Sequence, residues 1–224
     1  MTRRINPRLP SEQVSDLTAS RLSVYLRCLN TLDAAGVTAI SSRALAEQFH
    51  LNAAQIRKDL ACFGDFGVRG VGYRVRDLKQ HLRMILGLDR TVRVAILGAG
   101  NLGLALADYP GFKQEGFSIV GLFDADRSKV GRRSRGGVQI FDVDEFRTIV
   151  RRERINIAVI AVPAESAQTV ADTAVQAGVR AILNFSPGAL QVPAFVKLKN
   201  VDLTVSMESL SFFLARAESD AKSA

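Results

Sequence analysis

The sequence predicts an α/β protein in which an N-terminal winged helix-turn-helix domain precedes a Rossmann-like, doubly wound parallel sheet. Three observations support this fold class. Apolar periodicity of helix length dominates the first 90 residues. Strand-like and helix-like segments alternate after residue 91. A G-x-G-x-x-G segment, residues 98–103, stands between the first of those strands and a helix.

The charge of the chain is concentrated near its N-terminus. The 224 residues carry a formal net charge of +8, with 47% hydrophobic and 23% charged residues, a composition typical of globular proteins. Residues 1–90 hold 14 Lys/Arg and 8 Asp/Glu, a balance of +6, and residues 91–224 hold 16 and 14, a balance of +2. Such an excess predicts a polyanionic partner, either nucleic acid or an acidic membrane.

Several classes of protein are not expected. The longest apolar run, residues 155–164, is interrupted by Asn156 and is shorter than the ~20 residues of a membrane span. No signal peptide is recognised at the start of the sequence, so a cytoplasmic protein with its two cysteines reduced is expected. The two histidines, His50 and His81, are isolated from each other, and no metal site is predicted.

The first element expected is a helix with leucines at helical spacing over residues 22–32. Thr18 or Ser20 is the expected N-cap, and Gly36 is the expected stop. A fourth helix of the same domain is expected over residues 77–86.

The two helices between these form a helix-turn-helix pattern. The second helix begins at Ser41 or Ser42, and a short turn leads to the third helix over residues 53–63. Asn52 is the predicted cap of the third helix, with Gln55 completing a capping box. In a helix-turn-helix the second of the paired helices enters the major groove of DNA.

The third helix and the segment after it carry the predicted DNA contacts. Arg and Lys side chains match guanine O6 and N7, and Gln matches adenine. Glycines spaced through residues 63–75 predict a β-hairpin wing whose tip would enter a minor groove. The alternative is a plain helical bundle with a solvated Arg-Lys pair. The predicted DNA-binding residues are Ser41, Ser42, Gln55, Arg57, Lys58 and Arg69.

The glycine segment predicts a dinucleotide site. A strand over residues 92–97 leads into it; the first glycine permits the turn, the second lets the backbone approach a pyrophosphate, and the third lets helix and strand pack closely. The next strand, residues 118–123, ends at Asp124, an acid suited to bind ribose hydroxyls and to repel a 2′-phosphate. NAD(H) is therefore favoured over NADP(H). Arg127 nearby could weaken that preference, but it is expected to be a solvated loop residue. The alternative is a glycine loop that only turns.

The alternation continues to the C-terminus. Strands are expected over 138–141, 157–162, 181–185 and 201–205, and helices over 144–150, 164–177 and 207–217. Ligands of such sheets bind at the carboxyl ends of the strands. The predicted nucleotide-binding residues are Gly98, Ala99, Gly100, Asn101, Leu102, Gly103, Asp124, Ala161, Val162, Pro163, Asn184 and Phe185.

An enzyme is not expected. The spacing Tyr109-x-x-x-Lys113 matches the catalytic pair of short-chain dehydrogenases, but Pro110 and Gly111 between them break the helix that would align the pair. Residues 91–224 suffice for a nucleotide domain and leave no substrate domain. The nucleotide is therefore expected to act as a signal. Two rivals stay open: a small NAD-dependent oxidoreductase with a basic appendage, and a nucleotide-sensing module of a transport complex.

Six segments together resemble the bacterial redox-sensing transcriptional repressors called Rex. They are YLRCL (25–29), IRKDL (56–60), FGDFGVRGVGY (63–73), GAGNLG (98–103), AVPA (161–164) and ILNF (182–185). The resemblance runs from about residue 19 to residue 214. It implies a winged-helix domain over 1–88, a Rossmann NAD(H)-binding domain over 89–205, and a C-terminal helix over 206–224 that is exchanged between the subunits of a homodimer.

The resemblance also implies a function. Rex proteins bind palindromic operators in double-stranded DNA and are released by NADH, with NAD+ as the competing effector. Arg27, Tyr109 and Asp202 match switch residues proposed for the family. Leu203 follows Asp202 where some relatives carry an aromatic residue.

Overall fold

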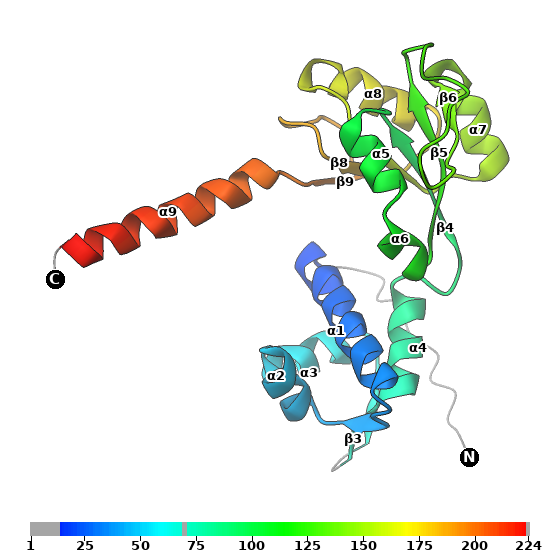
Figure 1. Ribbon diagram of the computed structural model, residues 1–224. Helices are drawn as coiled ribbons and strands as arrows, with labels where there is room; N and C mark the ends of the chain where they lie inside the picture. The colour runs from blue at the N-terminus through cyan, green and yellow to red at the C-terminus, as the bar shows by residue number, and fades with distance from the viewer. Residues whose placement is uncertain (1–13, 69–70, 223–224) are drawn as a thin grey trace. The chain divides into compact units, whose positions relative to one another are not determined.

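The structure is a computed structural model that describes residues 14–68 and 71–222. The chain divides into two compact units, Met1–Arg90 and Thr91–Ala224, which are described one by one. Helices of the first unit are α1 (Asp16–Ala34), α2 (Ser42–Phe49), α3 (Ala53–Ala61) and α4 (Val75–Ile85), and its strands are β1 (Ala39–Ile40), β2 (Gly67–Val68) and β3 (Gly72–Arg74) (Figure 1).

The first helix begins earlier than the sequence predicts. Ser15 is its N-cap, and the Ser15 hydroxyl accepts a hydrogen bond from the Thr18 backbone at 3.1 Å. The predicted caps Thr18 and Ser20 are therefore wrong, because a serine one turn earlier already accepts the free N–H. The predicted stop is confirmed, since Gly36 follows the helix with φ +76°.

The capping of the helix-turn-helix pair is confirmed in part. Ser41 Oγ accepts from the Ala44 backbone at 3.0 Å, and Asn52 Oδ1 accepts from the Gln55 backbone at 3.0 Å. The reciprocal half of the predicted capping box is wrong. The Gln55 amide donates to Asp59 at 2.8 Å instead of returning to Asn52.

The predicted wing is present as an antiparallel hairpin. Val68 pairs with Gly72 across the β2–β3 ladder, and β1 adds to the other edge of β3. Gly72 has φ +92°, and a Cβ there would lie 2.5 Å from the Ile40 carbonyl oxygen. Only glycine fits where the two strands approach so closely. The predicted wing residue Arg69 lies outside the described residues.

One apolar core holds this unit together and includes Ile56 and Leu60 of α3. Because apolar residues recur at helical spacing, α1, α3 and α4 each present an apolar face to this core, while Leu17 and Val24 of α1 are exposed. Among its fully buried members are Leu22, Leu26, Leu29, Leu45, Ile56, Leu78 and Leu82.

The second unit is built on a parallel sheet in the order β6-β5-β4-β7-β8-β9. In chain order this is 3-2-1-4-5-6, the strand order of Rossmann dinucleotide-binding folds, so the predicted doubly wound sheet is confirmed. Its strands are β4 (Val92–Leu97), β5 (Phe117–Asp124), β6 (Ile140–Asp142), β7 (Ile157–Ile160), β8 (Ala181–Asn184) and β9 (Lys197–Asn200).

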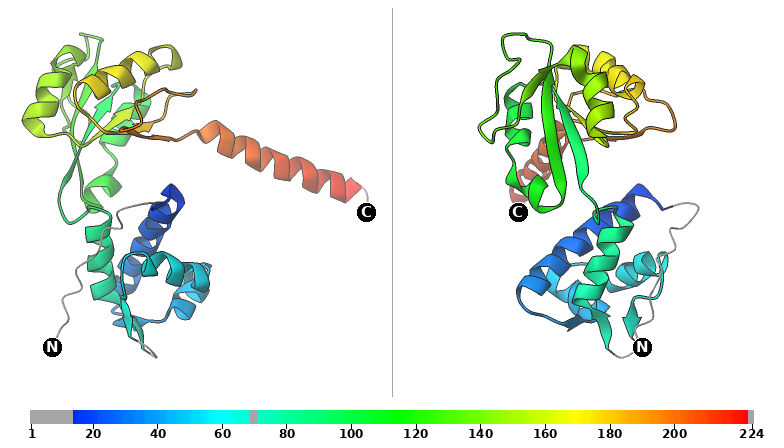
Figure 2. Two further views of the ribbon diagram at one scale, coloured as in Figure 1. Left: turned by 180° about the vertical axis from the view of Figure 1, so that it is seen from behind. Right: turned by 90° about the vertical axis from the view of Figure 1, so that its right-hand side faces the viewer.

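Helices lie on both faces of this sheet (Figures 1 and 2). One face packs on α7 (Phe146–Glu153) and α8 (Ala164–Gln176), with Phe123 and Phe146 at the centre of the contact. The other face packs on α5 (Asn101–Ala107). Short helices α6 (Pro110–Gln114) and η1 (Val143–Glu145, a 3-10 helix) complete the connections.

The C-terminal elements differ from the prediction. The expected strand over 201–205 is wrong, because β9 ends at Asn200 and α9 (Leu203–Lys222) already includes residues 203–205. The physical reason is a cap: Asp202 Oδ1 accepts from the Thr204 backbone at 2.8 Å, which starts a helix despite two β-branched residues in the segment. The strand predicted over 138–141 lies slightly later, at β6.

Candidate nucleotide site and DNA-binding surface

The glycine loop after β4 has three glycines in three different surroundings. Gly98 has φ +107°, and a Cβ there would overlap the Ala161 carbonyl oxygen. A Cβ on Gly103 would overlap the carbonyl oxygen of Gly98, so α5 packs closely on the strand. Gly100 is exposed, and within the described protein a Cβ added to it would meet no atom within 4 Å. Two glycines are thus needed by the fold, and the third leaves an open approach to the backbone.

A cleft of about 350 Å³ lies at the carboxyl ends of β4, β5 and β7. The strand order reverses between β4 and β7, and open α/β sheets bind ligands outside the strand ends at this point. Predicted residues that line it are Gly98, Gly100, Asp124, Ala161, Val162 and Pro163; others are Leu97, Phe123, Ala125, Lys129, Val143, Ser166 and Val170.

Asp124 is held against the glycine loop. Its Oδ2 accepts from the Ala99 backbone at 2.8 Å and from Lys129 Nζ at 3.0 Å, and its Oδ1 accepts from the Asp126 backbone at 2.9 Å. Burial alone would raise the pKa of this carboxyl, but these donors outweigh it and lower the pKa. The side chain is therefore a carboxylate at neutral pH, next to the second glycine.

Basic side chains border the open side of the glycine loop. A second hollow beside Gly100 and Asn101 is lined by Lys129, Arg132 and Arg133. The loop that carries these side chains is tied to the end of α5, because Asp108 accepts from the Ser134 hydroxyl at 2.5 Å. Positive charge beside an exposed backbone loop favours an anionic ligand such as a phosphate.

The remaining predicted nucleotide residues do not line the cleft. Leu102 is exposed, and Phe185 packs in the apolar cluster on the α5 face of the sheet. Asn184 is completely buried, and its amide is used within the protein: Nδ2 donates to the Ser186 carbonyl and to Asn200 Oδ1, each at 3.0 Å. Its side chain therefore organises the strand ends.

Lys129 is a charged residue of the cleft that was not predicted from the sequence. It follows Asp124 by five positions in a loop rich in basic residues. Arg127, the other cation nearby, is exposed and does not line the cleft, as expected of a solvated loop residue. Sequence spacing does not distinguish these two cations, because the choice depends on how the loop turns back.

The predicted DNA-binding residues that the structure describes lie on α3 and at the start of α2. Arg57 and Lys58 are exposed, and Arg57 Nη1 donates to Ser42 Oγ at 3.0 Å, which links the two helices of the pair. Ser41 accepts the capping bond of α2, and the Gln55 amide is half-buried against Asp59. The two cations are therefore the side chains best placed to reach a partner.

Asp59 is buried, unlike its exposed neighbours Arg57 and Lys58 on α3. It is 2% exposed and accepts hydrogen bonds from Arg21, Tyr25 and Gln55. The polar partners supplied by α1 explain its burial, because a buried carboxylate is tolerated when it is paired and hydrogen-bonded.

The three predicted switch residues are found in both units. Arg27 is exposed on α1. Tyr109 is 57% exposed and packs edge-on against Phe112, just before α6. Asp202 caps α9. Pro110 begins a short helix rather than preventing one, but Tyr109 precedes that helix.

Two further classes of site are absent from the described part of the chain. No group of three or more His, Cys, Asp or Glu side chains there is arranged to hold a metal ion. None of the helices described is long and apolar enough to cross a bilayer.

Family models match each unit separately. Residues 13–61 match a model described as "Putative DNA-binding protein N-terminus", and residues 89–188 match the model for a CoA binding domain. The second match covers the glycine loop and the cleft.

Curated relatives match nearly the whole chain. Proteins of Pelotomaculum thermopropionicum and Carboxydothermus hydrogenoformans are 46% and 47% identical over 93% and 91% of this chain and 98% of their own lengths. Both are named redox-sensing transcriptional repressor Rex, a repressor and not an enzyme.

Solved structures of RSP, a Rex-family repressor, match equally fully. The complex of RSP with β-NAD+ and operator DNA has a TM-score of 0.88 at 41% identity, and covers 95% of this chain and 97% of RSP. The complex with β-NADH has a TM-score of 0.82 at 39% identity, and covers 96% and 100%. With this identity across both units, the chain belongs to the Rex family of redox-sensing transcriptional repressors.

Proposed function

We propose that this protein is a homodimeric repressor that binds palindromic operators and is released from them by NADH. The observation that carries the proposal is the position of Gly100. No atom lies within 4 Å of a Cβ added there, and the residue lines the cleft where the strand order of the Rossmann sheet reverses. The same chain also has a winged helix. RSP has been solved with β-NAD+ and operator DNA and with β-NADH. A repressor of bacterial genes works in the cytoplasm.

The residues of the cleft suit a dinucleotide. The backbone at Gly100 would face the pyrophosphate, and Asp124 would accept hydrogen bonds from the ribose hydroxyls. Val162, on the apolar side of the cleft, would favour the neutral ring of NADH over the charged ring of NAD+. Asp124 would repel a 2′-phosphate, although Lys129 at 3.0 Å partly offsets that charge.

The first unit would supply the DNA contacts. Arg57 and Lys58 lie on the second helix of the helix-turn-helix, the element that enters a major groove. Lysine and arginine there can bind phosphates and guanine edges. The basic excess of residues 1–90 supports the same assignment.

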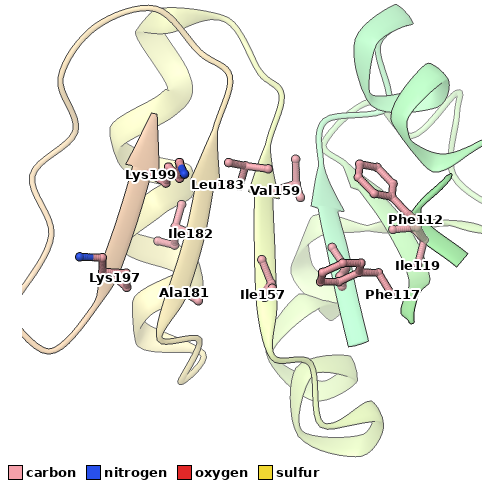
Figure 3. A pocket seen from close by; sticks show the side chains of 11 residues that line it. Phe112, Phe117, Ile119, Ile157, Val159, Ala181, Ile182, Leu183, Lys197 and Lys199 are labelled. Carbon is pink, nitrogen blue, oxygen red and sulfur yellow. The ribbon is translucent and has the colours of Figure 1, made fainter. Parts of the chain in front are cut away.

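Two apolar surfaces support the homodimer. A hollow of about 290 Å³ lies over β7 and β8, with Phe112 and Phe117 at one border and Lys197 and Lys199 at the other (Figure 3). Apolar side chains of α9 are 60% to 67% exposed in the single chain; they are Leu203, Val205, Met207, Leu210, Phe212, Phe213 and Leu214. Exposed apolar surface of this extent marks an interaction site, and we propose that α9 is exchanged with a second copy.

Release by NADH requires that ligand and DNA oppose each other. If NADH weakens operator binding, the operator must weaken NADH binding by the same factor. A coupling of ~1–3 kcal/mol corresponds to changes of ~5- to 150-fold in affinity.

The test is operator affinity titrated with NADH, NAD+ and NADPH at one salt concentration, using DNA from upstream of the protein's own operon. We expect NADH to weaken binding most, NAD+ to permit it, and NADPH to act only at higher concentration. Equal affinity under all three nucleotides would contradict the proposed function.

A further inference from the structure

Buried polar groups connect three neighbouring strand ends of the sheet. The Ser186 hydroxyl donates to the Val162 carbonyl at 2.6 Å, and the Ser186 backbone donates to Asn184 Oδ1 at 2.9 Å. Asn184 Nδ2 donates in turn to the Ser186 carbonyl and to Asn200 Oδ1, each at 3.0 Å. Asn184 and Ser186 are 0% and 6% exposed. The chain of bonds therefore runs from the loop after β7, through the buried Asn184 and Ser186, to Asn200, which is exposed at the end of β9.

This network reaches the point where β9 ends, close to the start of α9. Asn184 and Asn200 face each other in the β8–β9 ladder, and the Val201 backbone donates to the Asn184 carbonyl at 2.8 Å. Two residues after Asn200, Asp202 caps α9. Because a buried amide is costly unless its hydrogen bonds are made, a shift at Asn184 must be followed by its partners.

At its other end the network meets the cleft. Val162 lines the cleft, and a Cβ on Gly98 would lie 2.9 Å from its side chain, so the residue sits tightly against the glycine loop. The carbonyl of the same residue accepts from Ser186. A ligand that displaces Val162 would therefore disturb the hydrogen bond between the Val162 carbonyl and the Ser186 hydroxyl.

We propose that Asn184 is a positioning residue that couples occupancy of the cleft to the position of the β9–α9 junction. The proposal rests on the proposed function, because it assigns a route by which a bound dinucleotide reaches the helix that would pair the subunits. It adds Asn184, Ser186 and Asn200 as residues that transmit the ligand signal without contacting ligand or DNA.

The experiment measures a coupling ratio, the operator dissociation constant with saturating NADH divided by that without it. Ser186→Ala removes the bond to Val162, and Asn200→Ala removes one of the two acceptors of Asn184 Nδ2. Both leave the buried Asn184 in place, so folding should survive. Asn200→Asp keeps an acceptor oxygen and serves as the conservative variant. NADH affinity is read from NADH fluorescence, since the chain contains no Trp.

Asn156→Ala provides a matched control. Asn156 Oδ1 accepts from the Arg93 backbone at 2.9 Å, just before β7 and at the opposite end of that strand from Val162. The variant removes an asparagine hydrogen bond of the same sheet that the proposed route does not use.

For Ser186→Ala and Asn200→Ala we expect the coupling ratio to fall by about fivefold or more, with NADH affinity and ligand-free operator affinity each within about threefold of the parent. Asn200→Asp and Asn156→Ala should keep the parent ratio. An unchanged ratio in both alanine variants would overturn the inference, as would loss of NADH binding itself, which would place these residues in the ligand site. If NADH does not change the operator affinity of the parent protein, the proposed function itself is overturned.

Discussion

Arg21 and Asp59 form a two-point ion pair that joins α1 to α3. Arg21 Nε lies 2.6 Å from Asp59 Oδ2, and Arg21 Nη2 lies 2.8 Å from Oδ1. Tyr25 and Gln55 donate to the same carboxylate at 2.9 and 2.8 Å. These donors, Arg21 first, lower the pKa of Asp59 against the opposing effect of burial. The helix that carries Arg57 and Lys58 is thereby fixed in orientation on the first helix.

Replacing this carboxylate should destabilise the first unit. We expect Asp59→Ala to lower its free energy of unfolding by about 2–3 kcal/mol, because the Tyr25 hydroxyl loses a buried acceptor and Arg21 loses its counter-ion. The Arg21 side chain is 34% exposed, which reduces the cost below that of a fully buried pair. Urea unfolding of the full chain, followed by circular dichroism, measures the change.

The control for this prediction is Glu47→Ala. Glu47 pairs with Arg43 at 2.8 Å in an exposed pair on α2, and its removal should cost no more than about 0.5 kcal/mol. Equal effects of the two substitutions would show that Asp59 contributes no more than a surface charge.

Stability should fall in acid, and Asp59 should account for part of the loss. Its pKa is lowered in the folded state relative to about 3.9 in an unfolded chain. The unfolded state therefore binds the proton more readily, so the stabilisation is complete above about pH 4 and is lost as pH falls through the folded pKa. Unfolding midpoints from pH 7 to pH 3 should decline less steeply below pH 4 in Asp59→Asn than in the parent; parallel declines would contradict this.

The three glycines of the loop should respond differently to alanine. Gly100 has φ −83° and open space around it, so Gly100→Ala should keep the parent unfolding midpoint. The methyl group of the new alanine would lie where the ligand approaches, so NADH affinity should fall by about tenfold to a hundredfold. Gly103→Ala, which would overlap the Gly98 carbonyl, should prevent stable folding of the second unit. Fluorescence titration of NADH together with thermal unfolding distinguishes the two effects.

Charge removal on α3 should weaken operator binding. We expect Arg57→Ala and Lys58→Ala each to cost ~1–3 kcal/mol, and the slope of log affinity against log salt to fall by about one for each phosphate that is no longer neutralised. Arg152→Ala, an exposed cation of the second unit, is the control and should change neither quantity. Anisotropy of labelled operator DNA at several salt concentrations provides both readouts.

The apolar face of α9 should hold the dimer together. Phe212 and Phe213 are 61% and 62% exposed in the single chain, and burying a Phe contributes ~1.5–3 kcal/mol. The double substitution to serine should therefore shift the protein toward monomers by about a hundredfold or more in dissociation constant. Sedimentation equilibrium measures it, with Ser209→Ala on the same helix as control. A double variant as dimeric as the parent would exclude α9 from the interface.

Local sequence signals predicted most of the elements. The parallel sheet was predicted from two signals: the glycine segment 98–103 between a strand and a helix, and the regular alternation of strands and helices after it. Both could be recognised because each signal acts within about ten residues. Two of the buried polar residues, Asp59 and Asn184, were beyond such signals. Asp59 obtains its main partner 38 positions earlier in the chain, and Asn184 bonds to a residue 16 positions later. The sequence alone predicts that such polar side chains are solvent-exposed, because the partner that allows their burial is distant in the chain.

The last strand of the sheet limits how two copies can meet. β9 is an edge strand on which Lys197 and Lys199 alternate with Leu198, and lysines on an edge disfavour pairing with a further strand. Growth of the sheet from one subunit into the next is thus opposed at this edge. The proposed exchange of α9 would instead leave the strands of each subunit undisturbed, so that the subunits could shift against each other without breaking a backbone ladder.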